Sequence, residues 1–196
     1  MRVIVFGASG GTGRCVLAAS DGATAFVRDP ATLDGRDHVV TGSVLDAAQV
    51  EAAIRGHDVV ISALGTRPWR HQDICSEGTR VIATAMAAAG VRRLLCVSSQ
   101  GVGDSRLGTA GNMFGLLLRR SFRDKAAMEQ MLEATDLEWT VVRPGMLTNG
   151  AARGTWRAAD GGELVGGKIA RADVAAFMLK EAAANEWVRR RPTLVW

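Results

Sequence analysis

Three glycines spaced three residues apart, Gly7, Gly10 and Gly13, carry the clearest chemical signal in the sequence. They follow an apolar run at residues 3–6 and begin a helical pattern. In such a setting the first glycine forms a tight turn, the second lets backbone approach a pyrophosphate, and the third allows close helix–strand packing. Exposed N–H groups at the helix start then hold negative charge. We therefore predict a nucleotide-binding loop, with a purely structural turn as the alternative. The loop also includes Ser9, Gly11 and Thr12.

The end of the second predicted strand, residues 24–27, indicates which dinucleotide is bound. Strands that select NAD usually end in an acidic residue, which binds the ribose 2′-hydroxyl. Arg28 stands in that place, and a guanidinium can hold a 2′-phosphate through two hydrogen bonds. The sequence therefore favours NADP(H). Pairing of Arg28 with the adjacent Asp29 is the structural alternative, and Arg14 either assists with phosphates or is solvated.

Composition and spacing exclude several other classes. The scattered Cys15, Cys75 and Cys96 argue against a disulfide framework and for a reducing, cytoplasmic compartment. No histidine, cysteine and carboxylate cluster suits a metal, and no G-x-S-x-G elbow points to a hydrolase. The net charge of +4 comes mostly from arginine. Residues 189–191, the one basic triplet, are interpreted as a solvated helix end, with a polyanion contact as the alternative.

The predicted partner is accordingly a small molecule. The apolar strand pattern at Val3 leaves no room for a signal peptide, and no apolar run is long enough to span a bilayer. We expect no nucleic-acid or membrane partner, and a monomer or weak homodimer.

Short β-branched runs alternate with alanine-rich segments, a pattern typical of a parallel α/β sheet. The predicted strands are residues 3–6, 24–27, 38–41, 58–64, 94–98 and 139–143, and the predicted helices are 11–19, 46–55, 73–89, 113–134 and 171–184. Residues 100–112 are expected to form a loop, residues 150–167 turns with one hairpin, and residues 193–196 an edge strand. Residues 1–196 thus form a single domain, a Rossmann-type doubly wound parallel sheet with flanking helices.

Five further segments add to the glycine loop: VRDP at 27–30, ALGTR at 63–67, SEGT at 76–79, VSS at 97–99 and VRPG at 142–145. With them the chain resembles the atypical short-chain dehydrogenase/reductases that bind NADP. Within these it is most similar to the flavin reductase/biliverdin reductase B group, over nearly its whole length.

The resemblance implies where the cofactor lies. NADP would cross the strand ends, with Ser43 and Val44 beside the adenine and Ser99 beside the nicotinamide. Ser99 has the alternative of a turn serine that bonds its own backbone. Other cofactor-lining residues implied by these segments are Gly10, Thr12, Arg28, Leu64, Gly65, Thr66 and Ser98. Arg143, Pro144, Gly145 and Met146 would close over the nicotinamide carboxamide, although Pro144 also suffices to stop the strand.

Two departures from the family pattern affect this interpretation. The first helix is about one turn shorter than usual, which could shift Arg28 relative to the ribose. Classical members use Y-x-x-x-K, but here Ser121 precedes Lys125 at that spacing, and the chain contains no tyrosine. A serine hydroxyl is too weak an acid to replace a phenol. Lys125 and Ser99 are the catalytic candidates, and a surface or ribose-contacting role suits Lys125 better.

The substrate-side candidates follow the fourth predicted strand. Trp69 could stack on a ring, and Arg67 or Arg70 could bind a phosphate or propionate, with an ordinary surface loop as the alternative. Met113 and Phe114 would supply an apolar wall, unless they belong to the core. Met146 stands where the biliverdin reductase B pattern has histidine, which favours flavins over tetrapyrroles.

We therefore expect an NADPH-dependent reductase that transfers hydride to a planar conjugated acceptor such as free flavin, bound as a substrate and not as a prosthetic group. Such acceptors delocalise negative charge and can take their proton from solvent, so the protein mainly positions two rings. A non-catalytic, NADP-sensing regulator of the NmrA-like type and a ketoreductase with an unconventional acid are the alternatives.

Overall fold

The computed structural model describes residues 1–33, 35–65, 73–105, 109–161 and 163–196, and the side chains of residues 109–118 lie outside this description. In this part of the chain, eight strands form one sheet in the order β3-β2-β1-β4-β5-β6-β10-β8. All neighbouring strands are parallel except β10 and β8. The strands are β1 (Val3–Phe6), β2 (Thr24–Val27), β3 (Val39–Thr41), β4 (Val59–Ser62), β5 (Arg93–Val97), β6 (Glu138–Pro144), β8 (Arg157–Ala159) and β10 (Thr193–Val195).

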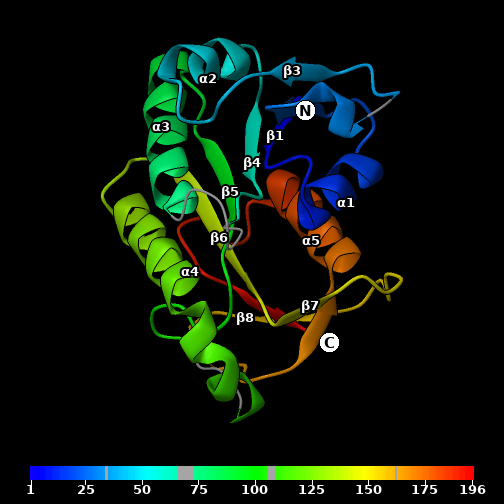
Figure 1. Cartoon of the computed structure of the whole chain (residues 1–196), viewed down its shortest axis with the longest axis vertical. Helices are drawn as coiled ribbons and strands as arrows, with labels where there is room; N and C mark the ends of the chain where they lie inside the picture. The colour runs from blue at the N-terminus through cyan, green and yellow to red at the C-terminus, as the bar shows by residue number, and fades with distance from the viewer. Residues whose placement is uncertain (34, 66–72, 106–108, 162) are drawn as a thin grey trace.

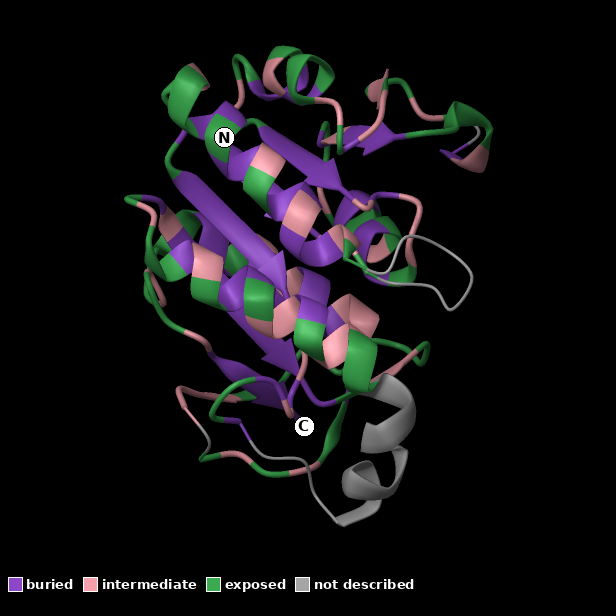
Figure 2. Ribbon diagram, turned by 60° about the vertical axis from the view of Figure 1, so that its left-hand side comes forward, coloured by how far each residue is buried: buried purple, intermediate pink, exposed green. Residues whose placement is uncertain are grey.

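Helices cover both faces of this sheet (Figure 1). On one face α1 (Gly11–Ala19) packs against α5 (Arg171–Ala184), and on the other α3 (Ile74–Ala89) lies between α2 (Ala47–Ile54) and α4 (Thr109–Glu133). Each face has its own apolar core, and the central strands are buried along their length (Figure 2). The strand order reverses between β1 and β4, which confirms the predicted doubly wound α/β fold. Ligands of such sheets bind at this reversal, outside the carboxyl ends of the strands.

Residues at both ends of α3 explain where this helix begins and ends. Gly90 adopts the left-handed conformation that closes α3, with φ of 71°. At the start of α3 the side chain of Asp73 makes no capping bond. Instead, the buried carboxylate of Asp124 from α4 accepts hydrogen bonds from the amides of Cys75 at 2.9 Å and Ser76 at 2.8 Å. A carboxylate near a helix N-terminus is stabilising, so Asp124 fixes α4 to α3.

The carboxyl-terminal third differs from the sequence-based expectation. β10 lies between β6 and β8, so the prediction of an edge strand at residues 193–196 is wrong. Residues 150–167 contribute β8 to this sheet instead of a hairpin. A separate two-stranded parallel sheet, which the sequence did not suggest, pairs β7 (Met146–Thr148) with β9 (Lys168–Ala170). The long helix α4 begins at residue 109, inside the predicted loop, because two glycines obscured its helical pattern.

The basic triplet at residues 189–191 is not a solvated helix end. It precedes β10, and Arg189 donates hydrogen bonds to the carbonyls of Thr135 and Glu133 at the end of α4, at 2.8 and 3.1 Å. Arg191 pairs with the carboxylates of Glu133 and Glu129. Arginines at the carboxyl end of a helix satisfy carbonyls that have no partner in the helix. Arg189 and Arg191 therefore fasten the end of α4.

No helix in the described ranges is both long and apolar enough to cross a membrane.

Candidate functional site

The glycine loop connects β1 to α1, and its three glycines meet different constraints. Gly7 has φ of 73°, and a Cβ there would lie 2.4 Å from the carbonyl oxygen of Ala63. A Cβ on Gly13 would lie 2.3 Å from the carbonyl oxygen of Gly7. Gly10 has φ of −79°, which any residue can adopt, and its nearest contact would be 3.2 Å away. The fold itself therefore requires Gly7 and Gly13, whereas Gly10 leaves an open approach to the backbone.

The start of α1 is suited to an anion. Gly10 precedes the helix and has no side chain that could bond the first-turn amides. Such amides are left without partners inside any helix, and together with the helix dipole they form an anion-binding site. Gly11 is exposed, Ser9 is half-buried, and Thr12 is 8% exposed. The predicted phosphate-binding loop thus has the geometry that its sequence implied.

Arg28 directly follows β2 and is exposed. In the described parts of the chain its side chain has no ion pair and no hydrogen bond. The carboxylate of Asp29 instead accepts a hydrogen bond from the amide of Ala31 at 3.1 Å. The alternative of an Arg28–Asp29 pair is therefore not realised, and the guanidinium of Arg28 is available to a ligand.

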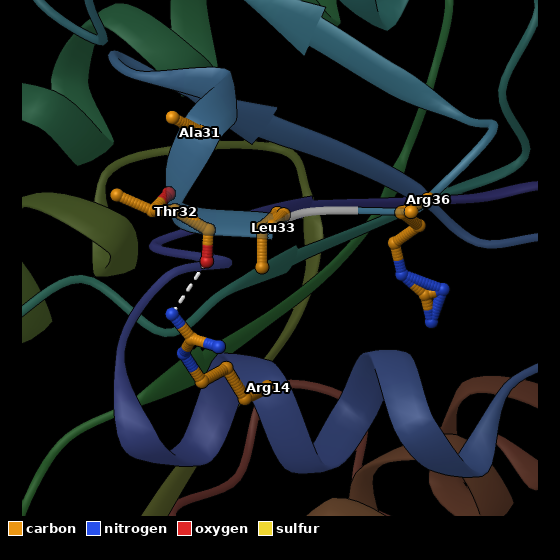
Figure 3. A pocket seen from close by; sticks show the side chains of 6 residues that line it. Arg14, Ala31, Thr32, Leu33 and Arg36 are labelled. Atoms are coloured by element: carbon orange, nitrogen blue, oxygen red, sulfur yellow. Dashed lines mark hydrogen bonds between the residues drawn. The ribbon is translucent and has the colours of Figure 1, made fainter.

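Arg14 joins the glycine loop to the segment that follows Arg28 (Figure 3). Its Nε donates to the carbonyl of Ser9 at 3.0 Å, and its Nη2 donates to the carbonyl of Thr32 at 2.5 Å. Arg14 is an exposed residue in the first turn of α1, as its second interpretation expected, and it also bonds two backbone carbonyls, while its role as a phosphate ligand stays a prediction. The side chain fixes the spacing between the two predicted phosphate sites.

An open hollow of about 670 Å³ lies beside this connection (Figure 3). Its second arginine, Arg36, donates to the carbonyl of Leu17 in α1. Because Arg14 and Arg36 both bind backbone carbonyls, their guanidinium groups hold the segment after β2 against α1. The hollow is lined by Arg14, Ala31, Thr32, Leu33, Gly35 and Arg36.

Val44, which was expected beside the adenine, and Leu64, which was expected to line the cofactor, both contact α3 at Gly78. A Cβ on Gly78 would lie 2.8 Å from Leu64 and 3.3 Å from both methyl groups of Val44. This contact explains the glycine of the SEGT segment, because a larger residue would push Leu64 and Val44 outward. Val44 is 8% exposed and packs in the core, whereas Gly65 is exposed with open space around it. Ser43 accepts a hydrogen bond from the amide of Leu45 at 3.3 Å.

The end of β5 brings both catalytic candidates together. Lys125 of α4 is half-buried, and its Nζ donates to the carbonyl of Ser98 at 2.8 Å, next to Ser99. Burial lowers the pKa of Lys125, and the nearby Cys75, Glu129 and Asp124 partly oppose that effect. Lys125 is therefore not a surface residue. The half-buried Ser99 hydroxyl makes no hydrogen bond within the described part of the chain, so it is not the self-bonded turn serine of the alternative.

Ser98 and Arg143 face the interior and not the expected cofactor site. The Ser98 hydroxyl is 1% exposed and donates to Glu129 Oε1 at 2.5 Å. Arg143, also 1% exposed, bonds both carboxylate oxygens of Glu129, at 3.2 and 2.5 Å, and Asp104 at 2.5 Å. Both side chains are therefore engaged inside the protein, and the placement of Ser98 and of residues 143–146 beside the cofactor stays a prediction that only their backbone could fulfil at these two residues. They instead support the strand ends that carry Ser99 and Pro144.

Charge compensation makes this buried network stable. Burial alone would lower the pKa of Arg143, but the hydrogen bonds and charges of Glu129 and Asp104 raise it above its ordinary value. The hydrogen bond from Arg143 correspondingly lowers the pKa of Asp104. The sequence analysis missed Glu129, although the K-x-x-x-E spacing from Lys125 would have placed both side chains on one helix face.

The end of β6 and the residues that follow it lie at the carboxyl edge of the sheet. Pro144 and Gly145 are buried, and the Gly145 amide donates to the carbonyl of Leu194 at 2.9 Å. Met146 begins β7 and is 67% exposed. The predicted contacts Thr66, Arg67, Trp69 and Arg70 lie outside the described residues, and so do the side chains of Met113 and Phe114. No group of three or more potential metal ligands occurs among the residues that the structure describes.

Comparison with known proteins agrees with this geometry. Residues 7–185 match the NAD(P)H-binding family, a span that begins at the first glycine of the loop and includes six of the eight strands of the described sheet, all but β1 and β10. The chain belongs to this family. NAD(P)H binding is therefore the property that this family shares.

Solved structures with the same fold include two relatives of particular interest. ChuY, an anaerobilin reductase from Escherichia coli O157:H7, is 26% identical with a TM-score of 0.85, and the match covers 100% of this chain and 97% of ChuY. A short-chain dehydrogenase/reductase from Veillonella parvula in complex with NADP is 19% identical with a TM-score of 0.79, covering 100% of this chain and 94% of that one. The second likeness is one of fold alone.

Proposed function

We propose that this family member is an NADPH-dependent reductase that transfers hydride to a planar conjugated acceptor, such as free flavin. The observation that carries the proposal is an open glycine loop together with an exposed Arg28 that pairs with no described residue, in a chain that contains no tyrosine. The first two features suit a 2′-phosphorylated dinucleotide. The third removes the usual phenolic proton donor, and with it the usual route for ketone reduction.

The residues fit this cofactor at each of its charged groups. Gly11 and Thr12 would offer their amides to the diphosphate, which Gly10 leaves room to approach because its own amide donates to the carbonyl of Gly7, and Arg28 would hold the 2′-phosphate. Arg14 keeps these two sites at a fixed separation through its bonds to the Ser9 and Thr32 carbonyls. NADPH supplies a hydride from its nicotinamide ring when bound. The protein contributes orientation, and the fixed geometry lowers the entropic part of the barrier.

Ser99 and Lys125 are the residues that we place nearest to the reacting atoms. The Ser99 hydroxyl, which bonds none of the described residues, can donate to the nicotinamide carboxamide or to the acceptor ring. Lys125 has spare donors beyond its bond to Ser98 and can hold a ribose hydroxyl. Reduction of a flavin takes up one hydride and one proton, and its delocalised charge lets solvent supply that proton. No side chain of this chain therefore needs to act as a strong acid.

A linear tetrapyrrole is the second candidate acceptor, because ChuY acts on one and its 26% identity covers the whole chain. The 67% exposed Met146 offers either acceptor an apolar contact beside the strand ends. Met146 lacks a histidine's donor and acceptor, which favours the flavin. The two acceptors differ in charge. A tetrapyrrole carries propionate groups, which would need arginine partners, whereas riboflavin carries no anionic group.

The test follows NADPH oxidation anaerobically with riboflavin, FMN, FAD and biliverdin as separate acceptors. We expect turnover with at least one flavin and slower turnover with NADH. Turnover with biliverdin but with no flavin would mean that the acceptor is a tetrapyrrole and not a flavin. Tight NADPH binding without turnover on any acceptor would refute the reductase and support a sensor.

A further inference from the structure

Arg171, the first residue of α5, lies across the glycine loop although about 160 residues separate the two in sequence. An ideal Cβ built on Gly11 would be 2.8 Å from both Cδ and Nε of Arg171, and 3.6 Å from Cζ. The close packing of α5 against α1 produces this contact (Figure 1). Gly11 nevertheless remains exposed, so the guanidinium lies at the open face of the loop.

A single neutral side chain anchors the Arg171 guanidinium. Its Nη1 donates to Oδ1 of Asn149 at 2.6 Å, just after β7. No ion pair joins Arg171 to a carboxylate among the residues that the structure describes. Its charge reaches the Cys15 thiol, where it lowers the pKa against the larger, raising effect of burial. The guanidinium is thus held in place by Asn149 while its charge has no acidic partner.

We infer that Arg171 completes the diphosphate site of the glycine loop. This inference rests on the proposed NADPH binding. A guanidinium has five N–H donors in a planar fork and binds phosphate oxygens through two of them. One donor is used by Asn149, so others remain for an anion that lies over Gly11. The backbone amides of the loop and the side chain of Arg171 would then hold the same diphosphate from two different elements.

The position of Arg171 distinguishes its role from that of Arg28. Arg28 lies at the end of β2, where a 2′-phosphate is expected, whereas Arg171 contacts the loop that receives the diphosphate. NADPH and NADH share the diphosphate and differ only in the 2′-phosphate. Loss of Arg171 should therefore weaken both dinucleotides by the same factor, and loss of Arg28 should weaken NADPH alone.

The experiment measures the Kd of NADPH, NADH and 2′-AMP by calorimetry for the wild type and for Arg171→Gln. We expect both dinucleotides to bind about tenfold to a hundredfold more weakly, as for a lost charge-assisted hydrogen bond. 2′-AMP, which has no diphosphate, should bind unchanged. Lys180→Gln removes a charge from the exposed side of the same helix and should bind all three ligands like the wild type.

Two further variants keep the test independent of folding. Arg171→Lys retains the charge but not the fork and should recover part of the lost affinity, while Asn149→Ala releases the anchor and should cause a smaller loss. Unchanged dinucleotide affinity in Arg171→Gln would overturn the inference, as would an equal loss for 2′-AMP or a loss for NADPH alone. A wild type that binds neither dinucleotide would instead overturn the proposed function as well. Binding without turnover would leave the role of Arg171 intact.

Discussion

Alanine substitutions at Gly10 and Gly13 should separate an effect on cofactor binding from an effect on folding, although each adds a single methyl group. In Gly13→Ala the new Cβ would lie 2.3 Å from the Gly7 carbonyl oxygen and 2.8 Å from Ala8 Cα, both backbone atoms that cannot rotate away. Relief requires α1 to move away from the loop. Overpacking of this kind costs about 1–3 kcal/mol, and rigid neighbours place this site near the upper value. For a domain of this size, about 3 kcal/mol lowers Tm by roughly 6–12 °C.

Gly10→Ala should behave in the opposite way. Its φ of −79° and ψ of 167° suit alanine, and the nearest contact of the new Cβ would be 3.2 Å. Reduced freedom of the unfolded chain contributes about 0.4–1 kcal/mol of stability, which offsets that tight contact. The methyl group would stand where the backbone meets the diphosphate, so NADPH affinity should fall at least tenfold, about 1.4 kcal/mol.

Thermal unfolding and NADPH titration of both variants check this pair of expectations. Gly10→Ala should unfold within about 2 °C of the wild type, by the same conversion, and bind poorly. Gly13→Ala should unfold earlier. A Gly10→Ala protein that binds NADPH like the wild type, or a Gly13→Ala protein with unchanged Tm, would refute the division of roles.

Three further predictions concern charge. Arg28→Gln should reduce the preference for NADPH over NADH about tenfold or more, measured as the ratio of Kd values, since a charge-assisted pair is lost; an unchanged ratio would mean that the short α1 has moved this contact. Glu129→Gln leaves the buried Arg143 with too little negative charge and should cost about 3–5 kcal/mol in chemical denaturation, against no more than about 1 kcal/mol for the control Glu51→Gln, whose half-buried carboxylate pairs with the exposed Arg55 on the surface of α2. Burial would raise the pKa of Asp173, but hydrogen bonds from Arg153, Trp196 and Gly154 leave it below the ordinary value. The stabilisation that ionised Asp173 gives the fold is therefore present above the pKa of Asp173 in the unfolded chain and is lost as pH falls through its pKa in the folded protein. Asp173→Asn should accordingly make the free energy of unfolding less dependent on pH in the acid range. A dependence as steep as that of the wild type would contradict this.

Local patterns predicted the amino-terminal half of the fold well. The strand at residues 3–6, the helix at residues 11–19 and the strand at residues 24–27 were predicted with the bounds that the structure has. Each depends on neighbours within a few residues: β-branched runs, glycines and a helical period. The turn role of Gly7 and the packing role of Gly13 were equally predictable, because strand, turn and helix follow one another directly in sequence.

The sequence did not predict the carboxyl-terminal part of the fold, because strand pairing there joins residues far apart in the chain. β10 reads as a short apolar run in isolation, and only its pairing with β6 and β8 reveals that it is internal. Arg143 follows the same rule: its place beside a strand-ending proline suggested a ligand contact, whereas its partners Glu129 and Asp104 come from two other elements. The sequence predicted Arg171 correctly as a helix start but did not predict its contact with Gly11, because no residue near Arg171 in sequence indicates that contact.

The internal position of β10 also sets an order of assembly during synthesis. β8 pairs only with β10 in the described sheet, so Arg157–Ala159 has no neighbour until Thr193–Val195 has left the ribosome. The strands β1 to β6 can meet earlier, since each finds its partner among residues already made. The glycine loop is therefore formed well before the rim that would receive an acceptor. A nascent chain that is complete to the end of β6 is expected to have formed the glycine loop and the strand end that carries Arg28, and to gain Arg171 of α5 and the acceptor half of the site later.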